Sequence, residues 1–301
     1  MKNSSCNRKG VFAIIVAYNP NLINILRLIS ILNHQVEKII VVDNGSANCS
    51  ELRAGCATAE NIEIIAFDKN FGIAYAQNCG IDFARNAKAE YLIFFDQDST
   101  IKEDFVFLLK NYFLKLSESS KVAVVAPIFK DEKKGFFYPL IRLRKFGLRR
   151  RITPDGSENF PIQVSFVISS GTFTSMAVVN EVGNMHSDFF IDYVDIEWCL
   201  RAAHAGYSLF AVPAVSMMHS IGDRSILFIR WRLAIHSEWR RYYRIRNSFF
   251  LYHFSHVPKI LALREIFVNI IHQFILIATQ KNKKKQIKYL MSGILDGIRF
   301  K

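Results

Sequence analysis

Short apolar runs alternate with segments of helical periodicity along the N-terminal part of the chain. Four runs have the length and composition of strands buried on both faces: Val11–Val16, Lys38–Val42, Ile62–Phe67 and Tyr91–Phe95. Helical spacing of apolar residues follows the first run, from Leu22 to Leu32, and precedes the fourth, over Ile73–Ala87. This alternation predicts right-handed βαβ units, and therefore an α/β fold whose mostly parallel sheet is flanked by helices.

The second half of the chain is less regular. A helix over Phe105–Leu116 and a strand over Val122–Ala126 precede an irregular region, residues 130–161, of a length that is usually functional or mobile. Its basic residues are Arg142, Arg144, Lys145, Arg149, Arg150 and Arg151. The remaining predicted elements are a strand over Val164–Ser169, a helix over Val194–Ala205 and a last strand over Ser208–Val215.

Polar side chains stand where the predicted strands end. Asp96 and Asp98 follow the fourth run, Asp43 ends the second, and Tyr18 follows the first. An unpaired buried charge is costly, so Asp96 and Asp98 must lie in solvent or on a cation. Because ligands bind at the carboxyl ends of the strands in open α/β sheets, we expect these segments to form one site.

Length and composition allow one large domain with an appendage. The 301 residues are 50% hydrophobic, which is enough to bury a substantial core. Five cysteines without a Cys-x-x-Cys pair favour a reduced, cytosolic chain and argue against a disulfide framework or a structural zinc site. The apolar run at 11–17 is too short for a secretory signal, so we expect no export.

Charge divides the chain in two. Residues 221–301 carry 16 Lys/Arg against 4 Asp/Glu, a net +12, whereas residues 1–220 carry 23 against 22. We therefore expect a sheet domain over residues 1–225 and a basic helical region over residues 226–301. The partners of this basic region should be anionic: lipid headgroups, a phosphorylated lipid substrate or nucleic acid.

The C-terminal region contains an amphipathic pattern. Its apolar stripe consists of Ile260, Leu263, Phe267, Ile270, Phe274 and Ile277. A helix of this kind suits the surface of an anionic membrane, and equally suits packing on the sheet domain or on a second subunit in a homodimer. We do not expect it to span a bilayer, because Arg264, Glu265 and His272 are costly at a bilayer centre.

Several segments together resemble the family 2 glycosyltransferases of the GT-A fold, over roughly residues 10–225. They are Ala17–Asn19, Val41–Ser46, Asn70–Gly72, Asn78–Gly80, Phe95–Asp98, Asp195–Arg201 and His219. The stretch Phe190–Cys199 is similar to that of bacterial dTDP-rhamnosyltransferases. The resemblance implies a Rossmann-like GT-A domain that binds a nucleotide sugar.

The resemblance also implies roles for individual residues. Donor contacts fall to Ala17, Tyr18, Asn19, Asp43, Gly72, Asn78, Asp96 and Gln97. Asp98, with His219 and Asp96, would hold Mg²⁺ or Mn²⁺, which carboxylate oxygens prefer, and Asp96 would also meet the ribose. The alternative for the two strand-end aspartates is that they are solvated turn residues.

Asp195 is the candidate general base, and Gly171 and Trp198 are candidates for the acceptor side. Inverting transfer needs a carboxylate that takes the proton of the acceptor hydroxyl. Asp192 and Glu197 compete for this role, and all three acids also suit the start of a helix. Trp198 could stack on a sugar or pack on the sheet, and the sequence leaves both open.

The expected function is transfer of L-rhamnose from dTDP-L-rhamnose to a glycan or lipid-linked glycan, in cell-surface polysaccharide synthesis of the O-antigen type. The enzyme would be inverting, metal-dependent and cytoplasmic, peripheral on the inner face of the membrane. One alternative is a UDP- or GDP-sugar transferase of the same fold. Another is a non-catalytic basic protein that binds membranes or nucleic acid, although we expect no nucleic acid partner.

Overall fold

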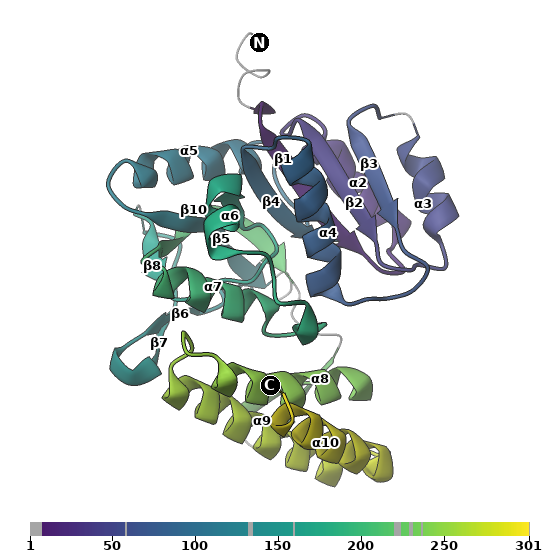
Figure 1. Ribbon diagram of the computed structural model, residues 1–301, viewed down its shortest axis with the longest axis vertical. Helices are drawn as coiled ribbons and strands as arrows, with labels where there is room; N and C mark the ends of the chain where they lie inside the picture. The colour runs from purple at the N-terminus through teal and green to yellow at the C-terminus, as the bar shows by residue number, and fades with distance from the viewer. Residues whose placement is uncertain are drawn as a thin grey trace.

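The structure, a computed structural model, describes residues 8–57, 59–131, 135–158, 160–219, 224–228, 231–235 and 237–300. For residues 219, 224–228 and 231–235 it describes the backbone alone. The described chain folds into a layered α/β domain, drawn in purple to green in Figure 1, and a group of helices beneath it.

An eight-stranded sheet forms the centre of the molecule. Its strands are β1 (Val11–Ala17), β2 (Lys38–Asp43), β3 (Ile62–Ala66), β4 (Tyr91–Asp96), β5 (Val122–Asp131), β8 (Ile162–Val164), β9 (Phe173–Ser175) and β10 (Ser208–His219). Their spatial order is β3-β2-β1-β4-β9-β5-β10-β8. Only the pairings of β9 and β8 are antiparallel within this described sheet, so the predicted mostly parallel α/β architecture is confirmed.

Helices cover both faces of the sheet, because each strand buries apolar side chains on both sides. One face is covered by α2 (Leu22–Leu32), α3 (Cys49–Cys56) and α5 (Phe105–Ser117). The other face, toward the viewer in Figure 1, is covered by α4 (Ile73–Asn86), α6 (Met176–Val182) and α7 (Val194–His204). These helices place the carboxyl ends of β1, β2 and β4 at one edge.

Three predicted elements differ from the structure. The predicted strand over Val164–Ser169 is wrong: β8 ends at Val164, and Thr172 then closes a turn by donating to Ile168 O at 2.7 Å. This turn directs β9 between β4 and β5. The irregular region contains a hairpin, β6 (Leu140–Leu143) and β7 (Arg149–Ile152), joined by the short turn η1 (Lys145–Gly147).

The last predicted strand is longer than expected. β10 runs beyond Val215 to His219, with a register shift against β5 between Val212 and Ser216. Pro213 lies in this interval, and a proline cannot donate a ladder hydrogen bond. A second hairpin follows, β11 (Arg224–Phe228) and β12 (Trp231–Ile235).

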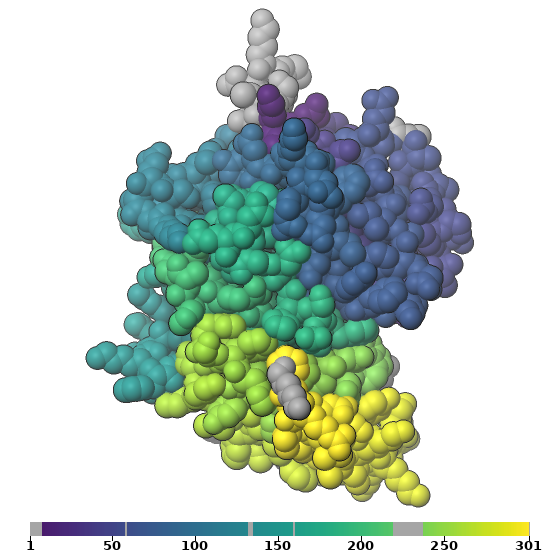
Figure 2. All heavy atoms as spheres, in the orientation of Figure 1, coloured from purple at the N-terminus to yellow at the C-terminus, as the bar shows by residue number. Residues whose placement is uncertain are grey.

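Three helices form the C-terminal region: α8 (Glu238–His253), α9 (Lys259–Thr279) and α10 (Lys283–Ile298). They lie side by side at the base of the molecule, in yellow-green and yellow in Figures 1 and 2. Phe250, Leu251 and Leu261 belong to the same buried cluster as the residues of α4 and α7. The helical region is therefore fused to the core of the sheet domain.

α9 presents its apolar stripe to the outside. Leu263 is 53% exposed, Phe267 66% and Phe274 56%, whereas the polar Asn269 and Gln273 are buried on the inner side. The predicted stripe therefore does not pack on the sheet domain. α9 is also long and apolar enough, by these two criteria, to cross a membrane, although a third of its apolar window is buried.

Candidate active site

The strand ends meet as the sequence predicts. The register pairs Ala17 with Asp43 on one side of β1, and Val16 with Asp96 on the other. Asp98 follows in an exposed turn, two residues beyond the end of β4. Carboxylates from β2 and β4 therefore flank the end of β1.

Two amide side chains hold this edge together. Gln97 Oε1 accepts from Tyr18 N–H at 2.7 Å, and Gln97 Nε2 donates to Tyr18 O at 3.3 Å. Asn19 Oδ1 accepts from Ala47 N–H at 2.9 Å. Because both amides bind backbone, they fix the relative positions of the strand ends and leave the Tyr18 ring exposed.

Asp43 is fully buried at the end of β2. Its Oδ1 accepts from Ser46 N–H at 2.8 Å, but Oδ2 has no hydrogen-bond partner among the described residues. A buried carboxylate oxygen without a donor is costly. A ligand N–H or O–H group at this oxygen would remove that cost.

Gly72 and Asn78, which the resemblance assigns to donor binding, contact other segments of the chain in the structure. A Cβ on Gly72 would lie 2.6 Å from Phe190 O, and its φ of +91° is one that glycine adopts readily. The Asn78 carboxamide donates to Met185 O at 2.9 Å and accepts from Met185 N–H at 2.8 Å. Both residues fasten α4 to the segment that precedes α7.

The predicted metal ligands come from two strands. Thr100 forms a β-bridge with Met218, which brings the end of β10 beside the turn that contains Asp98. The backbone of His219 ends β10, but its side chain lies outside the described residues. Among the described side chains, no group of three His, Cys, Asp or Glu residues has the arrangement of a metal site.

Asp195 is half-buried in the first turn of α7. Its Oδ1 accepts from Ile196 N–H at 2.9 Å, and it borders a small cavity of about 20 Å³ that Phe94 and Trp198 also line. Burial, together with the charges of Asp192 and Asp96, raises the pKa of Asp195 to about 6. The structure thus brings Asp195 and Asp96 close enough for their charges to interact.

Both competing acids are held by cations. Asp192 pairs with Arg240 at 3.0 Å and with Arg244 at 3.1 Å. Glu197 is fully buried and contacts Arg201 at 2.8 Å and His256 at 2.9 Å.

Burial raises the pKa of Glu197, but hydrogen bonds from His256 and Arg201 outweigh it and leave the pKa below its usual value. By contrast, no basic side chain among the described residues lies within ion-pair distance of Asp195.

The acceptor-side candidates are buried. Trp198 Nε1 donates to Gly183 O at 2.8 Å, and its ring is buried in the core. Of the two roles that the sequence left open, the structure therefore favours packing on the sheet over stacking on a sugar. Gly171 is buried at φ +76°, and a Cβ there would lie 2.8 Å from Pro127 Cγ. Gly171 therefore allows the tight turn that leads into β9.

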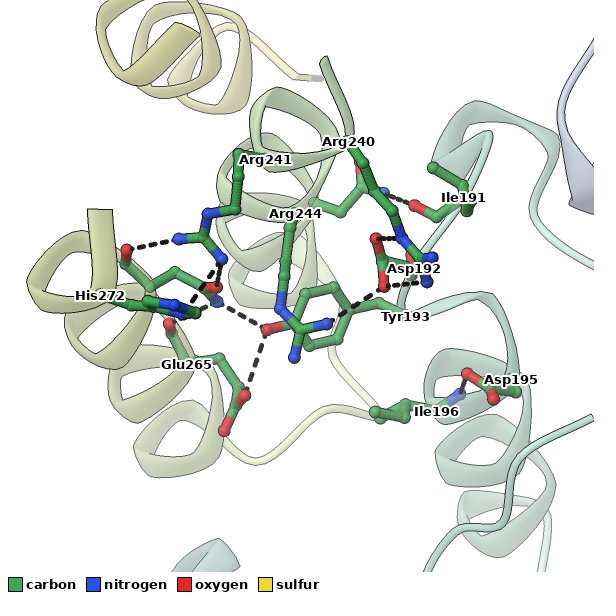
Figure 3. Close-up of polar contacts among 12 residues, drawn as sticks. Ile191, Asp192, Tyr193, Asp195, Ile196, Arg240, Arg241, Arg244, Glu265 and His272 are labelled. Carbon is green, nitrogen blue, oxygen red and sulfur yellow. Dashed lines mark hydrogen bonds and ion pairs between the residues drawn. The ribbon is translucent and has the colours of Figure 1, made fainter. Parts of the chain in front are cut away.

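Sequence reasoning missed the contribution of the C-terminal helices to this site. Figure 3 shows Arg240 and Arg244 of α8 directed at Asp192, three residues before Asp195. The only signal in the sequence is the spacing of the two arginines by four residues, which places them on one helix face. Asp192 is about fifty residues away from both arginines along the chain, so their ion pairs leave no local pattern in the sequence.

A family model matches the part of the chain that contains the strand-end carboxylates Asp43, Asp96 and Asp98. The model of the family described as "Glycosyl transferase family 2" matches residues 12–183, more than half of the chain. The chain belongs to this family. The expectation of a family 2 glycosyltransferase is confirmed, and the alternative of a non-catalytic binding protein is not supported.

A curated relative extends over the full length. The chain is 42% identical to dTDP-rhamnosyl transferase RfbF of Shigella flexneri over 290 residues, which cover 96% of each protein. The helical region is therefore part of what the two proteins share.

Two solved structures support the fold. GalNAc-T7, crystallised with UDP, GalNAc and Mn²⁺, superposes with a TM-score of 0.56 at 12% identity, over 94% of this chain and 57% of that one. S. aureus TarS 1-349 gives a TM-score of 0.50 at 12% identity, over 96% of this chain and 81% of the other. These likenesses show the GT-A fold.

Proposed function

We propose that this enzyme transfers L-rhamnose from dTDP-L-rhamnose to a glycan or lipid-linked glycan in cell-surface polysaccharide synthesis, with inversion. The proposal is supported by 42% identity to a dTDP-rhamnosyl transferase across nearly the whole chain. The observation that carries the mechanism is Asp195, a half-buried carboxylate beside Asp96 whose pKa is raised to about 6.

Asp195 acts as the general base. An acceptor hydroxyl attacks the anomeric carbon of the donor, the new C–O bond forms as the bond to the diphosphate breaks, and the proton passes to the Asp195 carboxylate. A pKa near 6 keeps the carboxylate ionised at neutral pH while making it a better proton acceptor than an ordinary aspartate. Asp192 and Glu197 are already engaged by cations, which favours Asp195 over them.

The nucleotide lies over the ends of β1, β2 and β4. The unsatisfied Oδ2 of Asp43 accepts a hydrogen bond from the base or the ribose, and Asp96 meets the ribose. Tyr18, exposed beside Ala17 and Asn19, covers the base. Gln97, Gly72 and Asn78 contribute indirectly, since their contacts hold the walls of this site.

We further propose that a divalent cation binds at the ends of β4 and β10. Asp98 and Asp96 offer hard carboxylate oxygens, and the charges of Asp96 and Asp195 repel each other, a repulsion that a cation would reduce. Asp98, Asp96 and His219 would hold Mg²⁺ or Mn²⁺. The ion would neutralise charge on the leaving diphosphate.

The helical region places the enzyme on the inner face of an anionic membrane. Exposed lysines follow the apolar stripe of α9, just before and within α10: Lys281, Lys283, Lys284, Lys285 and Lys288. Apolar side chains rimmed by basic ones suit the boundary between headgroups and acyl chains. A homodimer through the same stripe is the alternative.

A thermal-shift series tests the donor. A ligand that binds only the folded state raises Tm, and at equal concentration a tighter ligand raises it more, so dTDP-rhamnose with Mn²⁺ should raise Tm more than UDP- or GDP-sugars do. Asp98→Asn should lose the Mn²⁺-dependent part of this shift, whereas Asp68→Asn, in the loop after β3, should keep it. A larger shift with a UDP-sugar would overturn the donor assignment.

A further inference from the structure

The segment that carries the candidate base has an unusual backbone. Phe190, Asp192 and Tyr193 have φ values of +58°, +63° and +68°, in a region that residues other than glycine rarely adopt. The helix that begins with Val194 and Asp195 follows directly. Three such residues in four positions persist only when surrounding contacts hold them, and such strain is concentrated at functional sites.

The contacts that hold this segment come from α8. Arg240 and Arg244 bind the Asp192 carboxylate from two sides, at 3.0 and 3.1 Å. Asn247, one turn further along α8, donates its Nδ2 to Phe189 O, Ile191 O and Asp192 O, at 2.7, 2.8 and 3.1 Å. Residues 189–192 are thus attached to α8 both through the Asp192 side chain and through backbone carbonyls.

α9 completes the attachment through Tyr193. The Tyr193 hydroxyl donates to Glu265 Oε2 at 3.1 Å and accepts from Asn269 Nδ2 at 2.7 Å, both within the buried inner face of α9 (Figure 3). Glu265 also pairs with Arg149 of β7 at 2.9 Å. The base segment, two C-terminal helices and the β6–β7 hairpin therefore meet around one buried tyrosine.

The ion pair also balances charge near the base. Burial raises the pKa of Asp195, and the charges of Asp192 and Asp96 raise it further; the buried Cys199 thiol also senses the charge of Asp195. Burial lowers the pKa of the Arg244 guanidinium, but the charges of Tyr193, Asp192, Glu265 and Asp195 outweigh it and leave the pKa raised, so Arg244 lies close enough to interact with Asp195. Without the arginines, Asp192 would be an uncompensated carboxylate beside the base.

We propose that Arg240 and Arg244 are positioning residues for the glycosyl transfer: through Asp192 they hold the left-handed segment 190–193 so that Asp195 points at the acceptor hydroxyl. This inference rests on the proposed role of Asp195 as base. Asp192, Arg240 and Arg244 all lie outside residues 12–183, the part of the chain that the family model matches. The helical region therefore supports the catalytic site, in addition to presenting the apolar surface of α9.

Steady-state kinetics of the full-length enzyme test the proposal. Arg240→Gln/Arg244→Gln should lower kcat by about 10- to 100-fold, because a misplacement of about 1 Å has such an effect, while the Tm shift with dTDP stays unchanged. Arg240→Lys/Arg244→Lys should recover part of kcat. Lys121→Gln, which removes an exposed ion pair with Glu181 of α6, is the matched control and should leave kcat unaltered.

A double-mutant cycle separates positioning from general destabilisation. Asp192→Asn should lower kcat by a similar factor, and adding it to the arginine variants should cost little more, since the residues act as one unit. Folded arginine variants with full kcat, or independent effects that multiply, would overturn the proposal. An active Asp195→Asn enzyme would instead refute the base assignment itself.

Discussion

The sheet domain buries mainly apolar side chains, whereas the helical region also buries a group of polar and charged ones. The sheet is covered by helices that turn apolar residues inward, and its polar groups gather at the strand ends. The helical region encloses Arg241, Asn269 and Gln273, and leaves the apolar stripe of α9 exposed. The helical region therefore shares the apolar core of the sheet domain, and in addition it presents an apolar face outward and contacts the base segment.

This contrast separates two ways of stabilising a fold. Leu28 and its neighbours are stabilised by removal of apolar surface from water. Arg241 is held instead by hydrogen bonds to Gln273 Oε1 and Asn269 O, each at 2.9 Å, while burial lowers its pKa to about 10. A buried cation of this kind specifies one arrangement of α8 against α9, because any shift leaves it unsatisfied.

The largest expected effect lies in the sheet domain. Asp195→Asn keeps the shape of the side chain but removes the proton acceptor, so kcat should fall by about 10²- to 10⁴-fold with unchanged donor binding. Rates of transfer and the Tm shift with dTDP measure the two quantities. Full activity would move the base to another residue.

The pH profile supplies an independent check. Asp195 must be ionised to accept a proton, so kcat of the native enzyme should fall as pH decreases through about 6. The residual activity of Asp195→Asn should lack this acidic limb, and persistence of the limb would assign it to another group.

An intermediate effect is expected within the helical region. Arg241→Met leaves the buried Gln273 Oε1 without its donor and removes the bond to Asn269 O, so the free energy of unfolding should fall by about 1–3 kcal/mol. Urea denaturation measures this loss. An unchanged or higher stability would mean that the cost of burying the guanidinium exceeds the value of its hydrogen bonds.

The smallest effect on the folded enzyme should come from the outer face of α9. Phe267→Ser/Phe274→Ser should leave Tm and kcat on a soluble acceptor unchanged, since both rings are exposed. The variant should lose binding to vesicles of phosphatidylcholine and phosphatidylglycerol in equal parts, as measured by co-sedimentation.

Ile23→Ser, equally polar and at a residue 79% exposed on α2, is the matched control and should still bind the vesicles. If the α9 variant instead converts a dimer into a monomer without a change in vesicle binding, the homodimer alternative replaces the membrane.

Local pattern was sufficient for the sheet and for the strand-end acids. The apolar runs of β1, β2 and β4 are continuous, and parallel topology brings Asp43 and Asp96 to one edge without further information. The insertion of β9 was not predictable, because three residues in a turn-rich stretch carry too little periodicity.

Long-range contacts account for the rest of the site. The periodicity of α9 correctly identified an amphipathic helix, but it could not tell which face is buried, because the inner face is satisfied by Arg241 from another helix. Likewise, Phe190, Asp192 and Tyr193 have positive φ values although none of them is a glycine, so the sequence gives no sign of this backbone conformation.

The close approach at Gly72 has an evolutionary consequence. Any side chain at this position would press on Phe190, at the start of the segment that precedes Asp195, since a Cβ would lie 2.6 Å from its backbone oxygen. Selection should therefore keep position 72 as invariant as a residue that touches substrate, although its constraint comes from another part of the chain. Variation tolerated there would mark lineages in which the base segment has moved.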